Sequence, residues 1–196
     1  MKFSVILAGL FMSMIGSSSE QTEPAPNNLA DNTVLIIRHS EKPESGTGLT
    51  PQGEARAQLY TKYFQPFQEE GFSIMVDSLY AGADSASSNR PRLTLEPISK
   101  ATGLLLHHKI GTKESDALVR ELKTEPHGKY PLIAWRHGEI PALLIAFGAS
   151  PEQLLPNGKW PDDVYDWVIV LKMGPDGKPS SAKLIREHLR VPASIP

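Results

Sequence analysis

The stretch Val34–Pro43, VLIIRHSEKP, decides the fold of this chain: four aliphatic residues run directly into Arg38 and His39. A continuous apolar run is typical of a strand that is buried on both faces of a sheet. A charged pair is a poor end for such a strand unless that end binds a ligand. In open α/β sheets, ligands lie beyond the carboxyl ends of the strands. The stretch therefore predicts a central strand that ends at a ligand-binding edge.

Strand and helix patterns alternate along the rest of the chain. Thr50 is a suitable cap for a helix that begins at Pro51. Further strands are expected over residues 73–82, 130–135, 162–173 and 181–189, and further helices over 87–103, 114–124 and 138–148. This alternation predicts an α/β fold, a three-layer α/β/α sandwich with a mostly parallel central sheet.

Basic residues follow three of the expected strands. Arg38 and His39 end the first strand, Arg90 lies just past the second, and His137 follows the strand over 130–135. Because these strand ends should meet at one rim, the side chains should lie together. Guanidinium groups bind phosphate oxygens through paired hydrogen bonds, and a neutral imidazole can attack phosphorus directly.

A leaving alkoxide needs a proton, which a carboxylic acid can supply. Glu139, two residues after His137, is our first candidate for this acid, and Glu41 is a weaker one. Glu139 could equally be an ordinary acidic residue of a first helical turn, favoured by the helix dipole. Arg136 either shapes the rim or binds the distal part of a substrate. This chemistry requires no metal and no cofactor.

The motifs together resemble the signature of the histidine phosphatase superfamily, which has the phosphoglycerate-mutase-like fold. The matching segments are RHSEKP at residues 38–43, GLTPQGEARAQ at 48–58, SSNRPRLTLEP at 87–97, and His137-Gly138. The resemblance implies that His39 is the nucleophile and that Arg38, Arg90 and His137 complete a phosphate pocket. The HGE sequence implies the acid Glu139.

Two positions depart from the usual pattern of that superfamily. Ser40 stands where the motif has Gly or Ala, so its hydroxyl either joins the pocket or fills space. Pro91-Arg92 is also unusual, and Arg92 would replace Arg90 if the register differed by two residues.

The composition excludes several classes of partner and of chemical site. The chain has 196 residues and a net charge of −2, which gives no electrostatic case for binding nucleic acid or an anionic membrane. It has no cysteine, so it forms no disulfide and has neither a thiol nucleophile nor a thiolate metal site.

The first residues have the order of a signal peptide: a lysine, an apolar run from Phe3 to Ile15, and then small residues. We expect a signal peptide over residues 1–19, a disordered linker over 20–32 and a histidine phosphatase-like domain over 33–196. The mature protein would then be periplasmic or secreted, with no membrane span once the signal is cleaved.

These observations predict an exported, metal-independent phosphomonoesterase that acts through a phosphohistidine on His39. The segment between the Arg90 helix and the strand at residue 130 is short, so the chain resembles the small, uncapped branch of the superfamily. An open site suits a small-molecule or glycan phosphate monoester, such as an envelope sugar phosphate. A phosphomutase and a non-catalytic module that binds phosphate or another oxyanion are the alternatives.

Overall fold

The computed structural model describes residues 27–192. Its strands are β1 (Thr33–Arg38), β2 (Phe67–Glu69), β3 (Phe72–Ile74), β4 (Ser78–Ala81), β5 (Leu106–His107), β6 (Pro131–Trp135), β7 (Trp167–Met173) and β8 (Pro179–Arg186). Six of them form one sheet in the order β5-β4-β6-β1-β7-β8, while β2 and β3 form a separate hairpin. The strand that opens the domain therefore lies inside the sheet, as its apolar run predicts.

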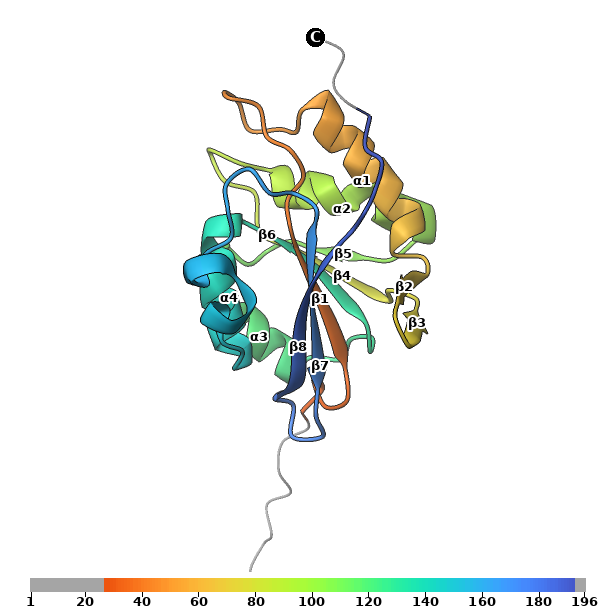
Figure 1. Cartoon of the computed structure of the whole chain (residues 1–196), viewed down its shortest axis with the longest axis vertical. Helices are drawn as coiled ribbons and strands as arrows, with labels where there is room; N and C mark the ends of the chain where they lie inside the picture. The colour runs from red at the N-terminus through yellow and green to blue at the C-terminus, as the bar shows by residue number, and fades with distance from the viewer. Residues whose placement is uncertain (1–26, 193–196) are drawn as a thin grey trace, which may run out of the picture.

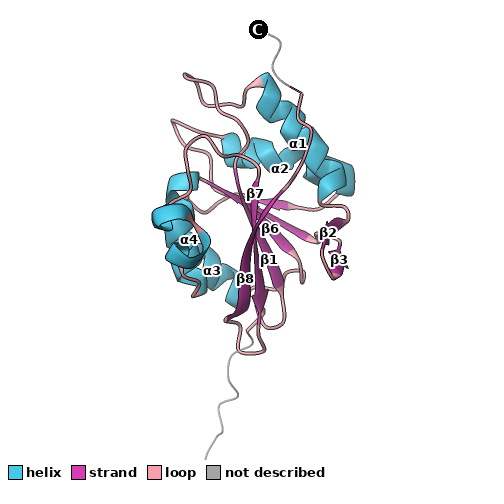
Figure 2. Cartoon of the chain, viewed as in Figure 1, coloured by secondary structure: helices cyan, strands magenta, loops and turns pink. Residues whose placement is uncertain are grey.

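The helices cover both faces of this sheet (Figure 1). They are α1 (Pro51–Tyr63), α2 (Arg90–Thr102), α3 (Ser115–Thr124), α4 (Ile140–Phe147) and α5 (Pro151–Leu154), with 3-10 turns η1 (His137–Glu139) and η2 (Pro156–Gly158). Helices α1 and α2 lie on one face, and α3 and α4 lie on the other (Figure 2). The predicted three-layer α/β/α sandwich is confirmed.

The sheet is mixed. The pairs β5-β4, β4-β6 and β6-β1 are parallel, whereas β1-β7 and β7-β8 are antiparallel. β7 and β8 are antiparallel because a tight turn joins them, and a parallel pair would need a longer crossover connection. The expected sandwich is thus correct, and its parallel pairs are those among β5, β4, β6 and β1.

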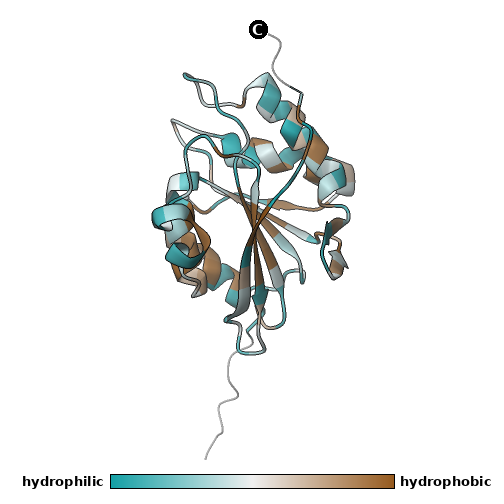
Figure 3. Ribbon diagram, in the orientation of Figure 1, coloured by the Kyte–Doolittle hydropathy of each residue, from teal (hydrophilic) through white to brown (hydrophobic). Residues whose placement is uncertain are grey.

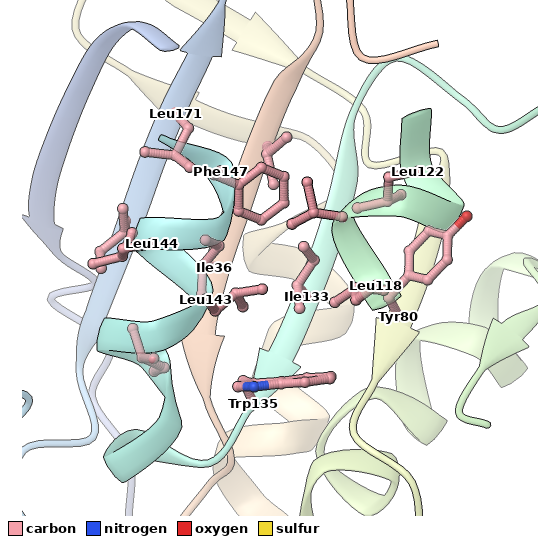
Figure 4. Close-up of a cluster of buried hydrophobic side chains, with 14 of the residues drawn as sticks. Ile36, Tyr80, Leu118, Leu122, Ile133, Trp135, Leu143, Leu144, Phe147 and Leu171 are labelled. Atoms are coloured by element: carbon pink, nitrogen blue, oxygen red, sulfur yellow. The ribbon is translucent and has the colours of Figure 1, made fainter. Parts of the chain in front are cut away.

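The two layers of helices define two cores, one on each face of β1. Val34 and Ile36 belong to the core under α3 and α4, whereas Leu35 and Ile37 face α1 and α2. This alternation is the period of two expected for a strand that is buried on both faces. Figure 4 shows the first core, in which Ile36 packs among side chains of α3, α4 and β6. The hydropathy colouring in Figure 3 shows apolar residues along the central strands.

Helix ends follow the local sequence. The Thr50 side chain accepts a hydrogen bond from the Gly53 amide at 3.0 Å, and Pro51 occupies the first helical position of α1. Gly103 ends α2 with a φ of 75°, in the left-handed region that glycine adopts without strain. Both ends lie where the sequence predicts them.

The domain begins before Thr33. Leu29, within the segment expected to be linker, is fully buried in the core under α3 and α4. The Asn28 amide donates to the Lys123 carbonyl at 3.0 Å. The polar composition of residues 27–32 concealed this single apolar anchor, so the linker prediction was wrong for these six residues.

Residues 1–26, and with them the expected signal peptide and the first part of the linker, lie outside the described residues. In the part of the chain that the structure does describe, no helix is long and apolar enough to cross a membrane.

Candidate active site

His39 lies directly after β1, where its amide continues the pairing with the Trp135 carbonyl of β6 at 3.0 Å. The residue is buried, and its Nδ1 lies 2.7 Å from the Ser40 carbonyl. A carbonyl oxygen can only accept, so Nδ1 carries the proton and Nε2 has a free lone pair. Burial, together with the charges of Arg38 and Arg90, lowers the pKa of His39 to about 3. The ring is therefore neutral at physiological pH.

Arg38 is completely buried, and part of its guanidinium holds the loop that precedes β7. Its Nη1 donates to the carbonyls of Pro161, Asp162 and Val164 at 3.2, 2.8 and 2.9 Å. The guanidinium carbon lies 3.8 Å from the centre of the Tyr165 ring, a cation–π contact. Within residues 27–192, the buried Nε of Arg38 has no hydrogen-bond partner. A buried donor without a partner is uncommon in a folded protein.

His137 stands beside His39, with the two ring centres 6.3 Å apart. Its Nδ1 lies 3.3 Å from Nη2 of Arg38, which has only protons to donate, so Nδ1 accepts. Its Nε2 lies 2.7 Å from a carboxylate oxygen of Asp162 and therefore donates. Burial and the charge of Arg38 lower the pKa of His137. A phosphate dianion bound here would raise that pKa again and favour the imidazolium form.

Arg90 is the first residue of α2 and lies over the loop between β1 and α1. Its Nε donates to the Gly48 carbonyl at 2.9 Å, and Nη2 donates to the Gly46 carbonyl. The Arg90 carbonyl accepts from Thr94 Oγ1, which in turn accepts from the Ser40 amide, so the start of α2 lies against the residue that follows His39. The structure thus brings together Arg38, His39, Arg90 and His137, from three separate segments.

Arg92, the alternative to Arg90, points elsewhere. Its Nε donates to Asp84 at 2.9 Å, and its Nη1 lies 3.6 Å from Glu96, one turn further along α2. The register that aligns Arg90 with the motif is therefore the one that the structure supports.

The two predicted acids differ in their surroundings. Glu41 is buried and bound by Arg56, whose Nε and Nη2 lie 3.0 and 2.8 Å from Glu41 Oε1. A carboxylate held in this way is a poor proton donor. Glu139 is half-buried in η1, and no residue in the described range forms a hydrogen bond with its carboxylate. The carboxylate in contact with His137 is instead that of Asp162, whose side chain is 85% exposed.

A buried polar network lies behind the motif. Arg56 bridges Glu41 and Glu187 and lies 2.6 Å from Glu187 Oε2, while the Tyr60 hydroxyl donates to Glu187 Oε1. Burial raises the pKa of Glu187, although Arg56 opposes this shift. The network fixes the backbone that follows His39.

Ser40 connects the nucleophile to α2. Its amide donates to Thr94 Oγ1 at 2.9 Å, and Thr94 Oγ1 donates to the Arg90 carbonyl at 2.9 Å. The Ser40 hydroxyl is buried and has no hydrogen-bond partner among the described residues. A buried hydroxyl in this position is a donor that a bound oxyanion could satisfy.

Sequence reasoning missed the contributions of Asp162, Tyr165, Arg56 and Glu187. Residues 161–166 have no periodic pattern, and we assigned most of them to the start of a strand. Arg56 did carry a signal, because an arginine in the buried face of a helix needs a carboxylate partner.

No family model matches this chain, and no curated protein matches it. Among solved structures, the protein histidine phosphatase SixA complexed with tungstate superposes with a TM-score of 0.54. The two sequences are 14% identical, and the match covers 79% of this chain and 97% of that chain. The chain therefore shares its fold with this protein histidine phosphatase, as the motifs predict.

Two further solved structures match less closely. Phosphoglycerate mutase from Plasmodium falciparum matches with a TM-score of 0.47 and 16% identity, over 84% of this chain and 93% of that chain. Mycobacterial glucosyl-3-phosphoglycerate phosphatase matches with a TM-score of 0.47 and 13% identity, over 79% and 97% of the respective chains.

Proposed function

We propose that this protein is a metal-independent phosphomonoesterase that acts through a covalent phosphohistidine on His39. The observation that carries the proposal is the state of His39: its ring is neutral, and Nδ1–H is fixed by the Ser40 carbonyl. Nε2 therefore presents its lone pair among Arg38, Arg90 and His137. A nucleophile that is activated and surrounded by cations suits a phosphate dianion. SixA, which shares the fold, binds tungstate, an oxyanion with the tetrahedral shape of phosphate.

Each group then has a role in two steps. Nε2 of His39 attacks phosphorus, the bond from phosphorus to the leaving oxygen breaks, and an acid protonates that oxygen. Water next attacks the phosphohistidine, so that inorganic phosphate leaves and His39 returns to its neutral form. Arg38 Nε and the Arg90 guanidinium bind the equatorial oxygens, and His137 gains positive charge as the dianion raises its pKa.

Glu139 and Asp162 are the two candidates for the acid. Glu139 is supported by its place after His137 and by a carboxylate that accepts no hydrogen bond among the described residues. Asp162 is supported only by its position, because its carboxylate accepts from His137 Nε2 at 2.7 Å and would have to leave that donor and take up a proton before it could act as the acid. An aryl phosphate has a good leaving group and needs little acid catalysis, whereas an alkyl phosphate depends on it. The variant of the true acid, Glu139→Gln or Asp162→Asn, should therefore lose about 100-fold on alkyl phosphates and far less on aryl phosphates. Equal losses on both substrates would exclude that residue as the acid.

We propose a small-molecule or glycan phosphate monoester as the substrate, and an envelope sugar phosphate in particular. Residues 103–130, between α2 and β6, hold only β5 and α3, so no capping insertion covers the site from there. An open site accepts a phosphate carried on a large molecule. The export that this substrate requires rests on the signal-like order of residues 1–19 and is part of the proposal.

The proposal is tested with purified residues 20–196 and p-nitrophenyl phosphate in the presence of EDTA. We expect phosphate release by the wild type and none by His39→Ala. Rapid acid-free quenching should trap a phosphoryl group on His39 that is stable to base and labile to acid. The catalytic proposal is falsified if the wild type releases no phosphate from any of a panel of monoesters between pH 4 and 8.

A non-catalytic oxyanion-binding module is the second candidate. It is favoured by the fact that no carboxylic acid in the described range contacts His39 directly. Such a module would bind phosphate with a measurable Kd, lose binding in Arg38→Gln and release no phosphate from any ester. A phosphomutase would instead transfer labelled phosphate between two hydroxyls of an acceptor without net release.

A further inference from the structure

A hollow of about 290 Å³ lies next to Arg90. Its walls come from the loop after β4, the turn before α3, and the exposed side chain of Arg136. Lys113 and the hydroxyls of Ser85 and Ser87 contribute further polar groups. None of these residues has a role in the chemistry proposed for His39.

The walls of this hollow are fixed by hydrogen bonds. Ser85 and Ser88 exchange backbone hydrogen bonds at 2.9 and 3.2 Å, which closes the loop after β4. The buried Trp135 donates from Nε1 to the Thr112 carbonyl at 2.9 Å, which fixes the turn before α3. A ligand here would therefore meet a formed site and would not have to order it.

The hollow carries more positive than negative charge. Asp84 accepts from Arg92 at 2.9 Å, which compensates its charge. Glu114 accepts from the neutral Gly111 amide at 2.8 Å and keeps its charge. In residues 27–192, neither Arg136 nor Lys113 forms a salt bridge. With the Asp84–Arg92 pair set aside, two cations face one carboxylate, so the hollow is positive overall.

The hollow adjoins Arg90. Ser88 lines it, and the Ser88 hydroxyl lies 3.4 Å from Nη1 of Arg90. Arg136 directly precedes His137 in the chain. Burial and the nearby charge of Arg136 both lower the pKa of Arg90, so the two guanidinium groups act on each other. Like charges held close together in this way are stabilised by an anion between or beside them.

We infer that this hollow binds a second oxyanion of the substrate, a carboxylate or a further phosphate, while His39 receives the first phosphate. Arg136 and Lys113 would bind the oxyanion, and Ser85 and Ser87 would contact neighbouring hydroxyls. The inference rests on the proposed function, because it names the substrate class of the same site. The preferred substrate would be a phosphomonoester of a hydroxylated molecule with a second anionic group.

Matched pairs of substrates test this inference. Each pair differs by one anionic group: 3-phosphoglycerate against glycerol 3-phosphate, and glucose 1,6-bisphosphate against glucose 6-phosphate. The wild type should prefer the more anionic member by about 10-fold in kcat/KM, the size of one charge-assisted contact. Arg136→Gln should reduce that ratio to about 2 or below. Preference within only the first pair would assign a carboxylate site, and within only the second a phosphate site.

The ratio of the two kcat/KM values within a pair does not depend on the fraction of a variant that is folded, because both substrates are assayed with the same protein preparation. Arg120→Gln is the matched control, since it removes an exposed arginine of α3 that does not line the hollow. This control should retain the wild-type ratio. A wild-type ratio near 1, or a ratio that Arg136→Gln leaves intact, overturns the inference even if His39 is catalytic.

A binding measurement separates this inference from the proposed function. The His39→Ala protein cannot form the phosphohistidine, so its Kd for the same four esters can be measured by calorimetry. The more anionic member of each pair should bind about 10-fold more tightly, and Arg136→Gln in that background should remove the difference. Equal Kd values within both pairs would contradict the inference whether or not the wild type hydrolyses any ester.

Discussion

A histidine that is buried among cations holds its proton weakly, and His39 is such a residue. Its pKa is about 3 in the folded chain, against the ordinary value of 6.5. Between these values the unfolded chain binds a proton that the folded chain does not. The free energy of unfolding should therefore fall as the pH is lowered through this window, by up to about 1.4 kcal/mol per pH unit.

Urea unfolding of the wild type and His39→Gln at pH 7, 6 and 5 measures this contribution. The wild type should lose more stability on acidification than His39→Gln, and the difference should increase at each step. Glu187 acts in the opposite direction. Because its pKa is raised in the folded state, the folded chain binds this proton more readily than the unfolded chain, and the free energy of unfolding rises as the pH is lowered. Since both proteins contain Glu187, its effect cancels in the comparison. Parallel pH profiles would show that His39 is not held neutral.

Arg56 is the residue whose removal should be most damaging outside the phosphate pocket. Arg56→Leu would leave the carboxylates of Glu41 and Glu187 buried without a cation. Breaking a buried ion pair in this way costs about 3–5 kcal/mol. Arg92→Leu, the control, removes a partly exposed pair with Asp84 and should cost about 1 kcal/mol or less. Denaturant unfolding measures the free energy of unfolding of both variants. Similar losses in Arg56→Leu and Arg92→Leu would mean that the Arg56 network is not needed for stability.

At the scale of elements, the start of α1 is packed against the loop that follows β1. A Cβ at Gly53 would lie 2.5 Å from the Glu41 carbonyl oxygen and 2.9 Å from the Glu41 amide nitrogen. Backbone atoms cannot move aside as a flexible side chain can. Gly53→Ala should therefore cost about 3 kcal/mol and displace the loop next to His39.

Gly138→Ala is the matched control for Gly53, because nothing lies within 4 Å of the added Cβ. Its free energy of unfolding should stay close to the wild-type value. If Gly53→Ala were equally well tolerated, α1 would not pack against the loop as described. The contact explains why the segment GLTPQGEARAQ needs its glycine at residue 53: α1 and the loop meet backbone to backbone.

The elements that the sequence predicts well are those with strong local signals. The apolar run of β1, the Thr50 cap and the Gly103 end of α2 each depend on neighbouring residues alone. The hairpin β2-β3 and the two-residue strand β5 were not predicted, because strands this short carry no clear period. Their pairing is decided by tertiary contacts.

At the scale of the whole molecule, the domain includes residues 27–32, which the sequence predicts to be part of a linker. Leu29 is fully buried, so Leu29→Ala should lower the free energy of unfolding by about 2–4 kcal/mol. Leu105→Ala is the control, because Leu105 is 72% exposed and its truncation should change stability little. Thermal unfolding of both variants in residues 20–196 tests the prediction. A similar Tm for the two would place the domain boundary back at Thr33.

The phosphate pocket could be predicted because one rule of α/β sheets brings parallel strand ends to one rim. That rule places Arg38, His39 and His137, and the helix register places Arg90. It says nothing about the loop at 161–166 or about Glu187, which reach the site through the antiparallel part of the sheet. Asp162 and Arg56 therefore acquire partners that no local pattern could indicate.

The place of β1 inside the sheet has a consequence for how the chain is made. β1 is the first strand synthesised, yet its two neighbours are β6 and β7, residues 131–135 and 167–173. Until those residues leave the ribosome, the apolar run of β1 has open hydrogen-bonding edges on both sides. Such a segment is prone to pair with other chains. We therefore expect nascent chains that stop before β7 to aggregate or to require a chaperone, and the phosphate pocket to form only when synthesis is nearly complete.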